Sequence, residues 1–251
     1  LVVGADGQHS AIRRLAFGDE SRFTQRIGAY LAIFGVPNML GLEDRAKVYN
    51  EPGLGVAYYT MVGNERAKAL FMYRSDAHAI DLRDEPALKA ALRARFQRVG
   101  WESRRLLDAM DSTSDFYFDE IAQIHMPAWS RGRVVLLGDA AHGPSPLSGQ
   151  GTSLAVVGAR LLDDALATHD PLSEAFAAYE RHMRPFVLQN QRLARSGLQL
   201  LVPGSRATIA IRNAAMRIFP LLLRLGVGFG KELEVASRAI ELPPLTAPPR
   251  S

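Results

Sequence analysis

An acidic residue followed by a glycine-rich loop is the clearest sign of chemistry in this chain. Asp139 follows the apolar run 134–137 after Gly138, and the loop 143–151 then leads into an apolar pattern with helical spacing. The first turn of a helix has unpaired N–H groups and the positive end of the dipole, so such a loop can bind anionic groups. A carboxylate at a strand end can hold a sugar hydroxyl. The pattern predicts a phosphate or cofactor site, the alternative being an ordinary strand-to-helix connection.

A second polar turn lies near the beginning of the chain. The run 1–3 is apolar and short, as in a strand, and Asp6 with Gly7 is a turn signal. Ser10 is a suitable N-cap for a helix at 11–17, with Arg13 one turn inside it. Both motifs therefore place a carboxylate in a turn between a short strand and a helix.

The rest of the chain must position these two motifs. Between them, alternating or short apolar runs predict strands at 27–36, 46–50, 55–62, 67–73 and 115–125, with turns at 51–53 and 63–65. Amphipathic helices are expected at 85–99 and 102–110. Three helices follow the second motif, at 152–168, 171–199 and 205–225, with Ser173 capping the second and Pro185 able to kink it. We expect the glycine run 226–230 to be a helix end and turn, and the proline-rich tail 242–251 to be loose.

Composition excludes several classes of function. Of 251 residues, 47% are hydrophobic and 22% charged, which is ordinary for a globular protein, and the net charge is +4. No cysteine is present, which excludes disulfides, thiolate metal sites and cysteine nucleophiles. The six histidines show no metal-ligand spacing, and the basic residues are scattered without a nucleic-acid motif. We therefore expect no metal, no nucleic-acid partner and no stable membrane insertion, and a cytoplasmic location.

The two motifs, in this order, resemble those of the class A flavoprotein monooxygenases, the aromatic-hydroxylase superfamily that includes p-hydroxybenzoate hydroxylase. Residues 4–13 resemble the DG motif of that family. Residues 138–151 resemble its GD motif with the adjoining loop, and we call residues 143–151 the flavin loop. Residues 179–185 resemble the helix that follows, so the resemblance extends across nearly the whole chain. The family's N-terminal GxGxxG unit is absent. The resemblance implies that it lay upstream of Leu1, and we expect this chain to be the C-terminal part of a longer protein.

The resemblance implies an α/β (α+β) fold, namely the C-terminal part of a Rossmann-like FAD-binding domain with an inserted antiparallel β-sheet substrate domain and C-terminal helices. FAD-binding segments are expected at 1–25 and 128–200, the substrate domain at 26–127, and a helical segment with the tail at 201–251. Alternation along the strands would turn only half of a set of sheet residues toward a substrate, and the sequence does not choose the face. That set is Tyr58, Tyr59, Met61, Phe71, Met72 and Tyr73.

The resemblance also assigns roles to residues of both motifs. Asp6 matches the carboxylate implicated in FAD and NADPH binding, and Gly7 would form the turn. Arg13 would bind the phosphates of the nicotinamide cofactor, unless it is a surface cation near a helix. Asp139 would accept a hydrogen bond from a ribityl or ribose hydroxyl of FAD. The full set expected at the cofactor is Asp6, Gly7, Arg13, Gly138, Asp139, Pro146, Gly149, Gln150, Gly151, Thr152 and Ser153.

Three expectations concern the flavin ring itself. Backbone N–H groups of 149–152 would face the pyrimidine edge of the isoalloxazine, where the helix end stabilises negative charge on reduction. Pro146 would flank the ring, or simply stiffen the loop. His142 can be read as an acid or base, but the resemblance favours a structural role. Ser153 and Gly158 stand where many members carry Asn and Asp, which suggests a subfamily acting on natural products.

The implied activity is that of an FAD-dependent monooxygenase. NADPH or NADH would reduce FAD, O₂ would form a flavin C4a-hydroperoxide, and one oxygen would pass to an aromatic or polyketide-like small molecule. The cofactor carries this chemistry, so no catalytic side chain is required. The alternatives are a flavin-dependent reductase or epoxidase of the same superfold, and a non-catalytic fragment unable to hold FAD. The sequence does not indicate an oligomeric state.

Overall fold

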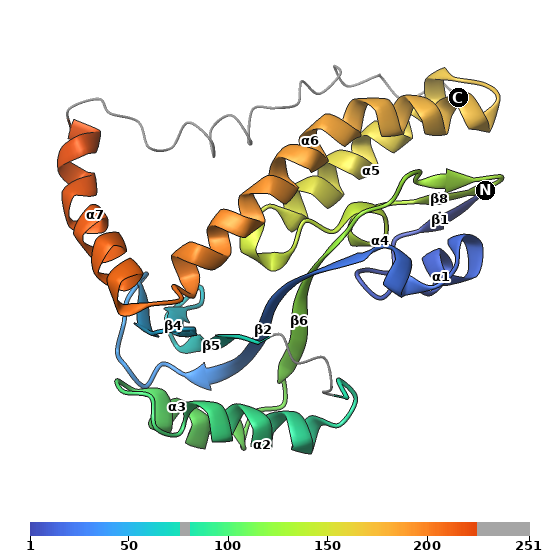
Figure 1. Cartoon of the computed structure of the whole chain (residues 1–251). Helices are drawn as coiled ribbons and strands as arrows, with labels where there is room; N and C mark the ends of the chain where they lie inside the picture. The colour runs from blue at the N-terminus through green and yellow to red at the C-terminus, as the bar shows by residue number, and fades with distance from the viewer. Residues whose placement is uncertain (76–80, 225–251) are drawn as a thin grey trace. The chain divides into compact units, whose positions relative to one another are not determined.

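The computed structural model describes residues 1–75 and 81–224, and within it the chain forms two compact units. The first unit includes Leu1–Ile27 and Ala122–Gly197, and the second includes Gly28–Ile121 and Leu198–Pro220. The domain boundaries expected at 25/26, 127/128 and 200/201 stay predictions, and residues 198–220 belong to the second unit, with the sheet. The expected mixed α/β architecture is confirmed (Figure 1).

The first unit is built on a small sheet with helices. Its strands have the order β1-β8-β7, in which β1 and β8 run parallel and β7 pairs antiparallel with β8. Its elements are β1 (Val2–Gly4), α1 (Ala11–Phe17), η1 (Glu20–Arg22), β7 (Ser130–Arg131), β8 (Val134–Leu136), α4 (Asp139–His142), η2 (Pro146–Ser148), α5 (Gly151–Thr168) and most of α6 (Leu172–Leu201).

Strand β8 and the long helices form the core of this unit. Helices α5 and α6 run alongside each other in Figure 1, and their apolar faces bury Leu161, Phe176 and Met183 in one cluster with Val135 and Leu136. Each such side chain contributes roughly 1.5–3 kcal/mol on burial. The packing of α5 and α6 against β8 thereby fixes the loops at the end of β8.

The second unit is a five-stranded antiparallel sheet with the order β3-β4-β5-β2-β6. The turns predicted at 51–53 and 63–65 join β3 to β4 and β4 to β5. Its elements are β2 (Thr24–Pro37), β3 (Ala46–Glu51), β4 (Leu54–Thr60), β5 (Arg66–Arg74), α2 (Glu85–Phe96), α3 (Ser103–Met110), β6 (Tyr117–Ile124) and α7 (Arg206–Arg224). Strands β2 and β6 each begin or end in the first unit.

One face of the sheet packs against α2 and α3. Tyr58, Phe71 and Tyr73 lie on this face in one buried cluster with Leu92 and Phe96 of α2. The rings of Phe71 and Phe96 meet edge to face with centroids 5.0 Å apart. Three of the six sheet residues that the sequence offered as substrate-facing thus belong to the core beneath α2 and α3.

Most elements lie where the sequence predicts them, with shifted ends. The predicted cap at Ser173 is wrong, because α6 begins at Leu172 and Ser173 lies inside its first turn. Helix α6 continues as one helix through Pro185. The one-turn helix α4 and strand β7 were not predicted. The glycine run 226–230 and the tail 242–251 lie outside the described residues.

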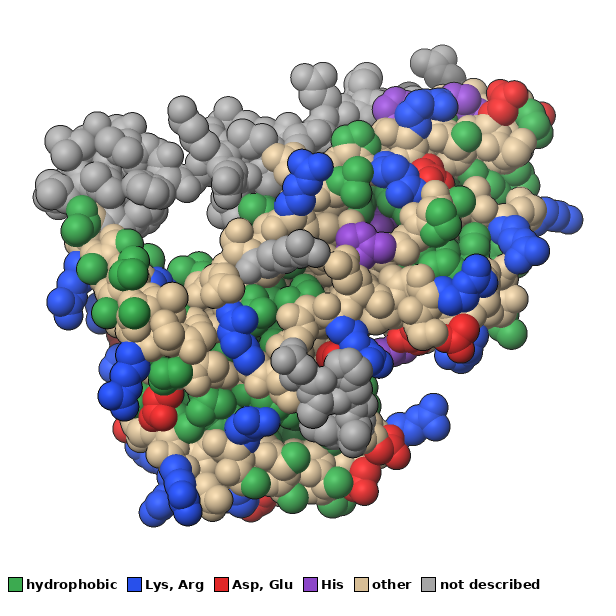
Figure 2. All heavy atoms as spheres, in the orientation of Figure 1, with side chains coloured by type: hydrophobic (Ala, Val, Ile, Leu, Met, Phe, Trp, Pro, Cys, Tyr) green, Lys and Arg blue, Asp and Glu red, His purple; other side chains and the backbone are tan. Residues whose placement is uncertain are grey.

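Surface and hydropathy add two observations. On the face shown in Figure 2, the described Lys and Arg side chains are dispersed among acidic and apolar ones and do not form a single patch. Among the described residues, no helix is both long and apolar enough to cross a membrane. Nor do the described His, Asp and Glu side chains gather into a group that could hold a metal ion.

Candidate cofactor site

The two sequence motifs meet at one edge of the parallel strand pair. Strands β1 and β8 are in register from Val2 opposite Val134 to Gly4 opposite Leu136. The N–H of Leu137 donates to the carbonyl oxygen of Gly4 at 2.9 Å, which extends the pairing past the strand ends. Because the strands are parallel, the DG turn and the GD turn both leave from this carboxyl edge, where open α/β sheets bind ligands.

Asp6 is tied into the start of α1. Its carboxylate accepts hydrogen bonds from the Ser10 hydroxyl at 2.5 Å and from the Ile12 N–H at 3.1 Å, and Ser10 caps the helix by accepting from the Arg13 N–H at 2.9 Å. Partial desolvation acts to raise the pKa of Asp6, but these hydrogen bonds outweigh it and hold the pKa below its ordinary value. Gly7 has φ +80°, the turn conformation expected of it. Asp6 is therefore an ionised carboxylate with its geometry fixed.

Arg13 is buried rather than displayed at the surface. Its side chain is 0% exposed, and its two terminal nitrogens donate to the carbonyl oxygens of Ala140 at 3.0 Å and Gln8 at 2.5 Å. The surface-cation interpretation is thus wrong, and the side chain links the DG turn to α4. Its expected contact with a nicotinamide-cofactor phosphate remains a prediction.

The GD motif begins with a backbone that only glycine adopts readily. Gly138 has φ 61° and ψ −141° and caps α4, which starts at Asp139. The side chain of Asp139 is exposed to solvent, yet the surrounding protein partly desolvates the carboxylate and raises its pKa. Because the carboxylate is open to solvent, its oxygens can accept a hydrogen bond from a ligand hydroxyl.

The flavin loop carries a second run of unusual backbone. Ser145 has φ 81°, which is strained for a residue with a side chain, and it caps the short helix η2 at Pro146. Gly149 has φ 66° and turns the chain into α5, whose first residue is Gly151. Strain of this kind persists only where neighbouring structure enforces it. The loop ends with the first residue of α5, Gly151, close to Asp139.

The residues present fit a flavin cofactor. A Cβ placed on Gly149 would meet no heavy atom within 4 Å, and one on Gly151 would meet only the Asp139 carboxylate oxygen Oδ1, at 4.0 Å. Helix geometry leaves the N–H groups of the first turn of α5 without partners in the helix, since Leu154 is the first to donate back, to Gln150. Pro146, Thr152 and Ser153 are exposed as well, and Gln150 is half-buried. The Asp139 carboxylate as acceptor, the N–H groups of the first turn of α5 as donors and the open space at Gly149 therefore lie next to one another.

His142 lies beneath this site and not in it. Its ring is 1% exposed, packs 4.6 Å from the ring of Trp129, and places Nε2 3.4 Å from the Tyr179 hydroxyl. Burial lowers the pKa of His142 to about 4, so the ring is neutral at pH 7. A neutral, enclosed imidazole is poorly placed for proton transfer with a ligand, which favours the structural interpretation.

Residues that the sequence did not single out form hydrogen bonds to the flavin loop. Gln123 donates through Nε2 to the carbonyl oxygens of Pro144 and Gln191, and the N–H of Ile124 donates to Gly143 at 2.9 Å. A lone glutamine in a strand gives no signal for such a role. Glu180 and Arg184 are different, because their i,i+4 spacing on a helix marks a pair.

That pair anchors the segment before β8. Glu180 accepts from the Trp129 N–H at 2.9 Å, and Arg184 pairs with Glu180 and covers the Trp129 ring at 4.7 Å. Arg184 also donates to the carbonyl oxygen of Met126. The helix that sequence resemblance singled out thus fixes the approach to the GD motif.

Comparison with known proteins identifies the fold and the motif region. A family model described as "FAD binding domain" matches residues 1–193. An uncharacterized protein of Mycobacterium tuberculosis is 44% identical over 194 residues, covering 77% of this chain and 52% of that protein. A flavin-dependent monooxygenase of Legionella longbeachae is 42% identical over 193 residues, covering 76% of this chain and 50% of that protein.

Solved structures agree with these relatives. The crystal structure of the tetracycline destructase Tet(55) matches 98% of this chain and 62% of its own, with 36% identity and a TM-score of 0.79. The chain spans about half the length of the curated relatives that it matches. The family match includes both motifs, the sheet between them and most of α6.

Proposed function

This chain belongs to the FAD-binding-domain family of the class A flavin-dependent monooxygenases, and on that basis we propose that it binds FAD and uses NADPH or NADH and O₂ to hydroxylate an aromatic or polyketide-like small molecule. Bound FAD would supply the redox chemistry, accepting electrons from the nicotinamide and activating oxygen. The protein would bind, orient and shield. The remaining question is which side chains do so.

The observation that carries this proposal is the Asp139 carboxylate beside the start of α5. Asp139 would accept a hydrogen bond from a ribityl or ribose hydroxyl, because it is exposed and partly desolvated. The N–H groups of Gly151, Thr152 and Ser153 would donate to the pyrimidine edge, where the positive helix end favours a reduced, anionic ring. Pro146 would flank the ring, with Gly149 leaving room for it.

The DG turn completes this assignment. Asp6 would lie near the FAD pyrophosphate, with Gly7 forming the turn that brings it there. A carboxylate cannot bind phosphate directly at neutral pH, so Asp6 would act by fixing the start of α1, where it accepts from the Ser10 hydroxyl and the Ile12 N–H. Arg13 would support both motifs by linking the DG turn to α4. By the family resemblance, it would also bind the phosphates of the nicotinamide cofactor.

The substrate would meet the sheet face that α2 and α3 leave uncovered. Register places Ile33 opposite Leu70 and Leu70 opposite Ala57, and these three lie on the opposite face from the α2–α3 core. Tyr59 and Met72 share that face. Ile33, Ala57, Tyr59 and Leu70 are half-buried and Met72 is buried. The apolar character of this face suits an organic ring, with the Tyr59 hydroxyl as a polar contact.

The substrate class rests on the relatives. The solved structure with 36% identity is that of a tetracycline destructase. Because that likeness covers 98% of this chain, it includes the sheet proposed to meet the substrate. We therefore place polycyclic aromatic and polyketide-like compounds first in a substrate screen.

Turnover with product analysis tests the proposal. The chain is supplied with FAD and NADPH or NADH, and nucleotide oxidation, oxygen uptake and product mass are followed across polycyclic phenols and tetracyclines. The proposal expects substrate-dependent nucleotide oxidation and a product heavier by one oxygen atom, labelled when ¹⁸O₂ is used. Nucleotide oxidation without an oxygenated product would favour a reductase. An epoxide that carries ¹⁸O and is formed from an alkene substrate would favour an epoxidase.

A further inference from the structure

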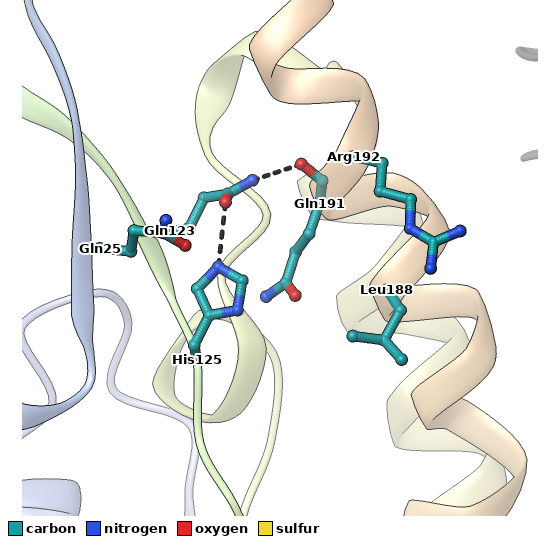
Figure 3. A pocket seen from close by; sticks show the side chains of 6 residues that line it. All are labelled: Gln25, Gln123, His125, Leu188, Gln191 and Arg192. Atoms are coloured by element: carbon teal, nitrogen blue, oxygen red, sulfur yellow. Dashed lines mark hydrogen bonds between the residues drawn. The ribbon is translucent and has the colours of Figure 1, made fainter.

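A pocket of about 390 Å³ lies in the first unit, and none of its lining residues belongs to the Asp139 turn or to α5. It is lined by Gln25, Gln123, His125, Leu188, Gln191 and Arg192 (Figure 3). The lining comes from the start of β2, the end of β6 and one face of α6. Its volume falls within the range of about 300–1,000 Å³ that is usual for small-molecule sites.

The polar groups at the back of the pocket are fixed in place. Gln123 is 3% exposed and Gln191 is 6% exposed. The side chain of Gln123 donates to the backbone carbonyl oxygens of Pro144 at 3.1 Å and Gln191 at 2.6 Å, and that of Gln191 donates to Ile124 at 2.8 Å. Both amides are therefore held by backbone and need little ordering when a ligand binds.

These bonds also determine the tautomer of His125. Because Nε2 of Gln123 donates twice, its Oε1 is the acceptor of the 3.0 Å bond with Nε2 of His125, so that histidine nitrogen carries the proton. Figure 3 shows the imidazole and the Gln191 side-chain amide facing the same space, with Leu188 beyond them. The ring is thus oriented by its neighbour and not free to turn.

The charge of the lining points to an anion. None of the six lining residues is acidic, whereas Arg192 is a permanent cation and His125 can become one. In the part of the chain that the structure describes, Arg192 forms no ion pair with a carboxylate. The guanidinium of Arg192 suits the oxygens of a carboxylate or phosphate. The volume exceeds that of a single oxyanion, and Leu188 supplies an apolar wall for the rest of a small organic molecule.

We infer that this pocket is a binding site for a small organic oxyanion, a carboxylate or phosphate ester with an apolar body. Arg192 binds the oxyanion and Leu188 contacts the apolar body. The amides of Gln123 and Gln191, whose N–H groups are bonded to backbone carbonyl oxygens, form the rigid back of the pocket. Gln123 also donates to the carbonyl oxygen of Pro144 in the flavin loop, so the ligand lies one side chain away from that loop. This inference stands on the pocket alone and does not depend on flavin binding.

Isothermal titration of the 251-residue chain tests it, with phenyl phosphate, benzoate, inorganic phosphate and neutral benzyl alcohol as probes at constant ionic strength. Phenyl phosphate or benzoate is expected to bind at least ~10-fold more tightly than benzyl alcohol, because a charged hydrogen bond to the guanidinium is lost with the neutral probe. Whichever of the two binds more tightly identifies the oxyanion. Inorganic phosphate binding as tightly as phenyl phosphate would contradict the role of the apolar body.

Matched variants locate the site. Arg192→Ala is expected to weaken the charged probes by at least ~10-fold, whereas Arg181→Ala, which removes an exposed charge from the same helix outside the pocket, changes binding less than about 2-fold. Leu188→Ala weakens phenyl phosphate but leaves inorganic phosphate unchanged. All three side chains are exposed, so their thermal unfolding should match the parent chain. Equal losses in R192A and R181A, or no binding by the parent chain, would overturn the inference.

Discussion

The guanidinium of Arg13 donates a hydrogen bond of 3.0 Å to the carbonyl oxygen of Ala140, which lies 127 positions further along the chain. A second nitrogen donates to Gln8 within the DG turn itself. The side chain is fully buried, and burial lowers the pKa of Arg13 while Glu20 and Asp6 oppose the effect. One cation thus holds the DG turn and the GD helix against each other, and a substitution there should disturb both.

Replacing Arg13 tests that link. Arg13→Ala removes two charge-assisted hydrogen bonds and leaves two carbonyl groups without these donors, so the free energy of unfolding should fall by about 3 kcal/mol. Arg14→Ala is the matched control, because Arg14 is adjacent and exposed, and it should change the value by less than about 0.5 kcal/mol. Urea unfolding followed by circular dichroism measures both. Similar losses in the two variants would remove the linking role.

Gly138 makes a second prediction, about backbone conformation. At φ 61° and ψ −141° a residue with a side chain is strained, and a Cβ there would also lie 3.4 Å from Cβ of Ala155. Gly138→Ala should therefore lower the free energy of unfolding by about 1–3 kcal/mol. Gly204→Ala, at an exposed site with open space around it, should be nearly neutral. A neutral Gly138→Ala would mean that the turn can relax.

The buried histidine predicts a pH dependence of stability. The pKa of His142 is about 4 in the folded chain and 6.5 for the solvated ring in the unfolded chain, so between these pH values the unfolded chain binds more protons. Stability from this group is therefore fully present above pH 6.5 and is lost as the pH falls toward 4, by up to roughly 3 kcal/mol.

The measurement compares urea unfolding at pH 7.5 and pH 5 in the parent chain and in His142→Gln. The variant will be less stable at both pH values, because it loses the packing against Trp129. The informative quantity is the change in the free energy of unfolding between pH 7.5 and pH 5, which should be smaller in the variant. An unchanged difference would show that other groups cause the pH dependence.

The two faces of the sheet predict opposite behaviour for adjacent tyrosines. Tyr58 is 0% exposed in the core beneath α2 and α3, so Tyr58→Ala should cost about 3–5 kcal/mol of stability. Tyr59 lies on the other face and is only half-buried, so Tyr59→Ala should cost less than half as much. Chemical denaturation of the pair measures this. Equal costs would contradict the assignment of the open face to the substrate.

Local patterns predicted much of this structure. The N-cap at Ser10 and the glycine turn at Gly7 follow from side-chain chemistry within a few residues, and the structure shows both. The strands were recognisable because apolar residues alternate. Alternation does not say which face α2 and α3 cover, so Tyr58 and Tyr59 could not be told apart from the sequence.

Relationships across long separations were beyond the sequence. The burial of Arg13 depends on Ala140, and the pocket requires Gln123 and Gln191 to meet from β6 and α6. The prediction of Ser173 as an N-cap was wrong for a smaller reason. The helix begins one residue earlier, and a serine inside the first turn gives the same sequence signal as a cap.

The most direct test of the account is a titration of this 251-residue chain with FAD, followed by flavin fluorescence, for the parent chain, Asp139→Ala and the control Asp163→Ala. Asp163 is an exposed carboxylate on α5, away from the helix start. We predict that the parent and D163A chains bind FAD alike and that D139A binds it at least ~10-fold more weakly, with unchanged thermal unfolding. No binding by the parent chain, or equal binding by all three, would contradict the claim that Asp139 and the start of α5 form a flavin site.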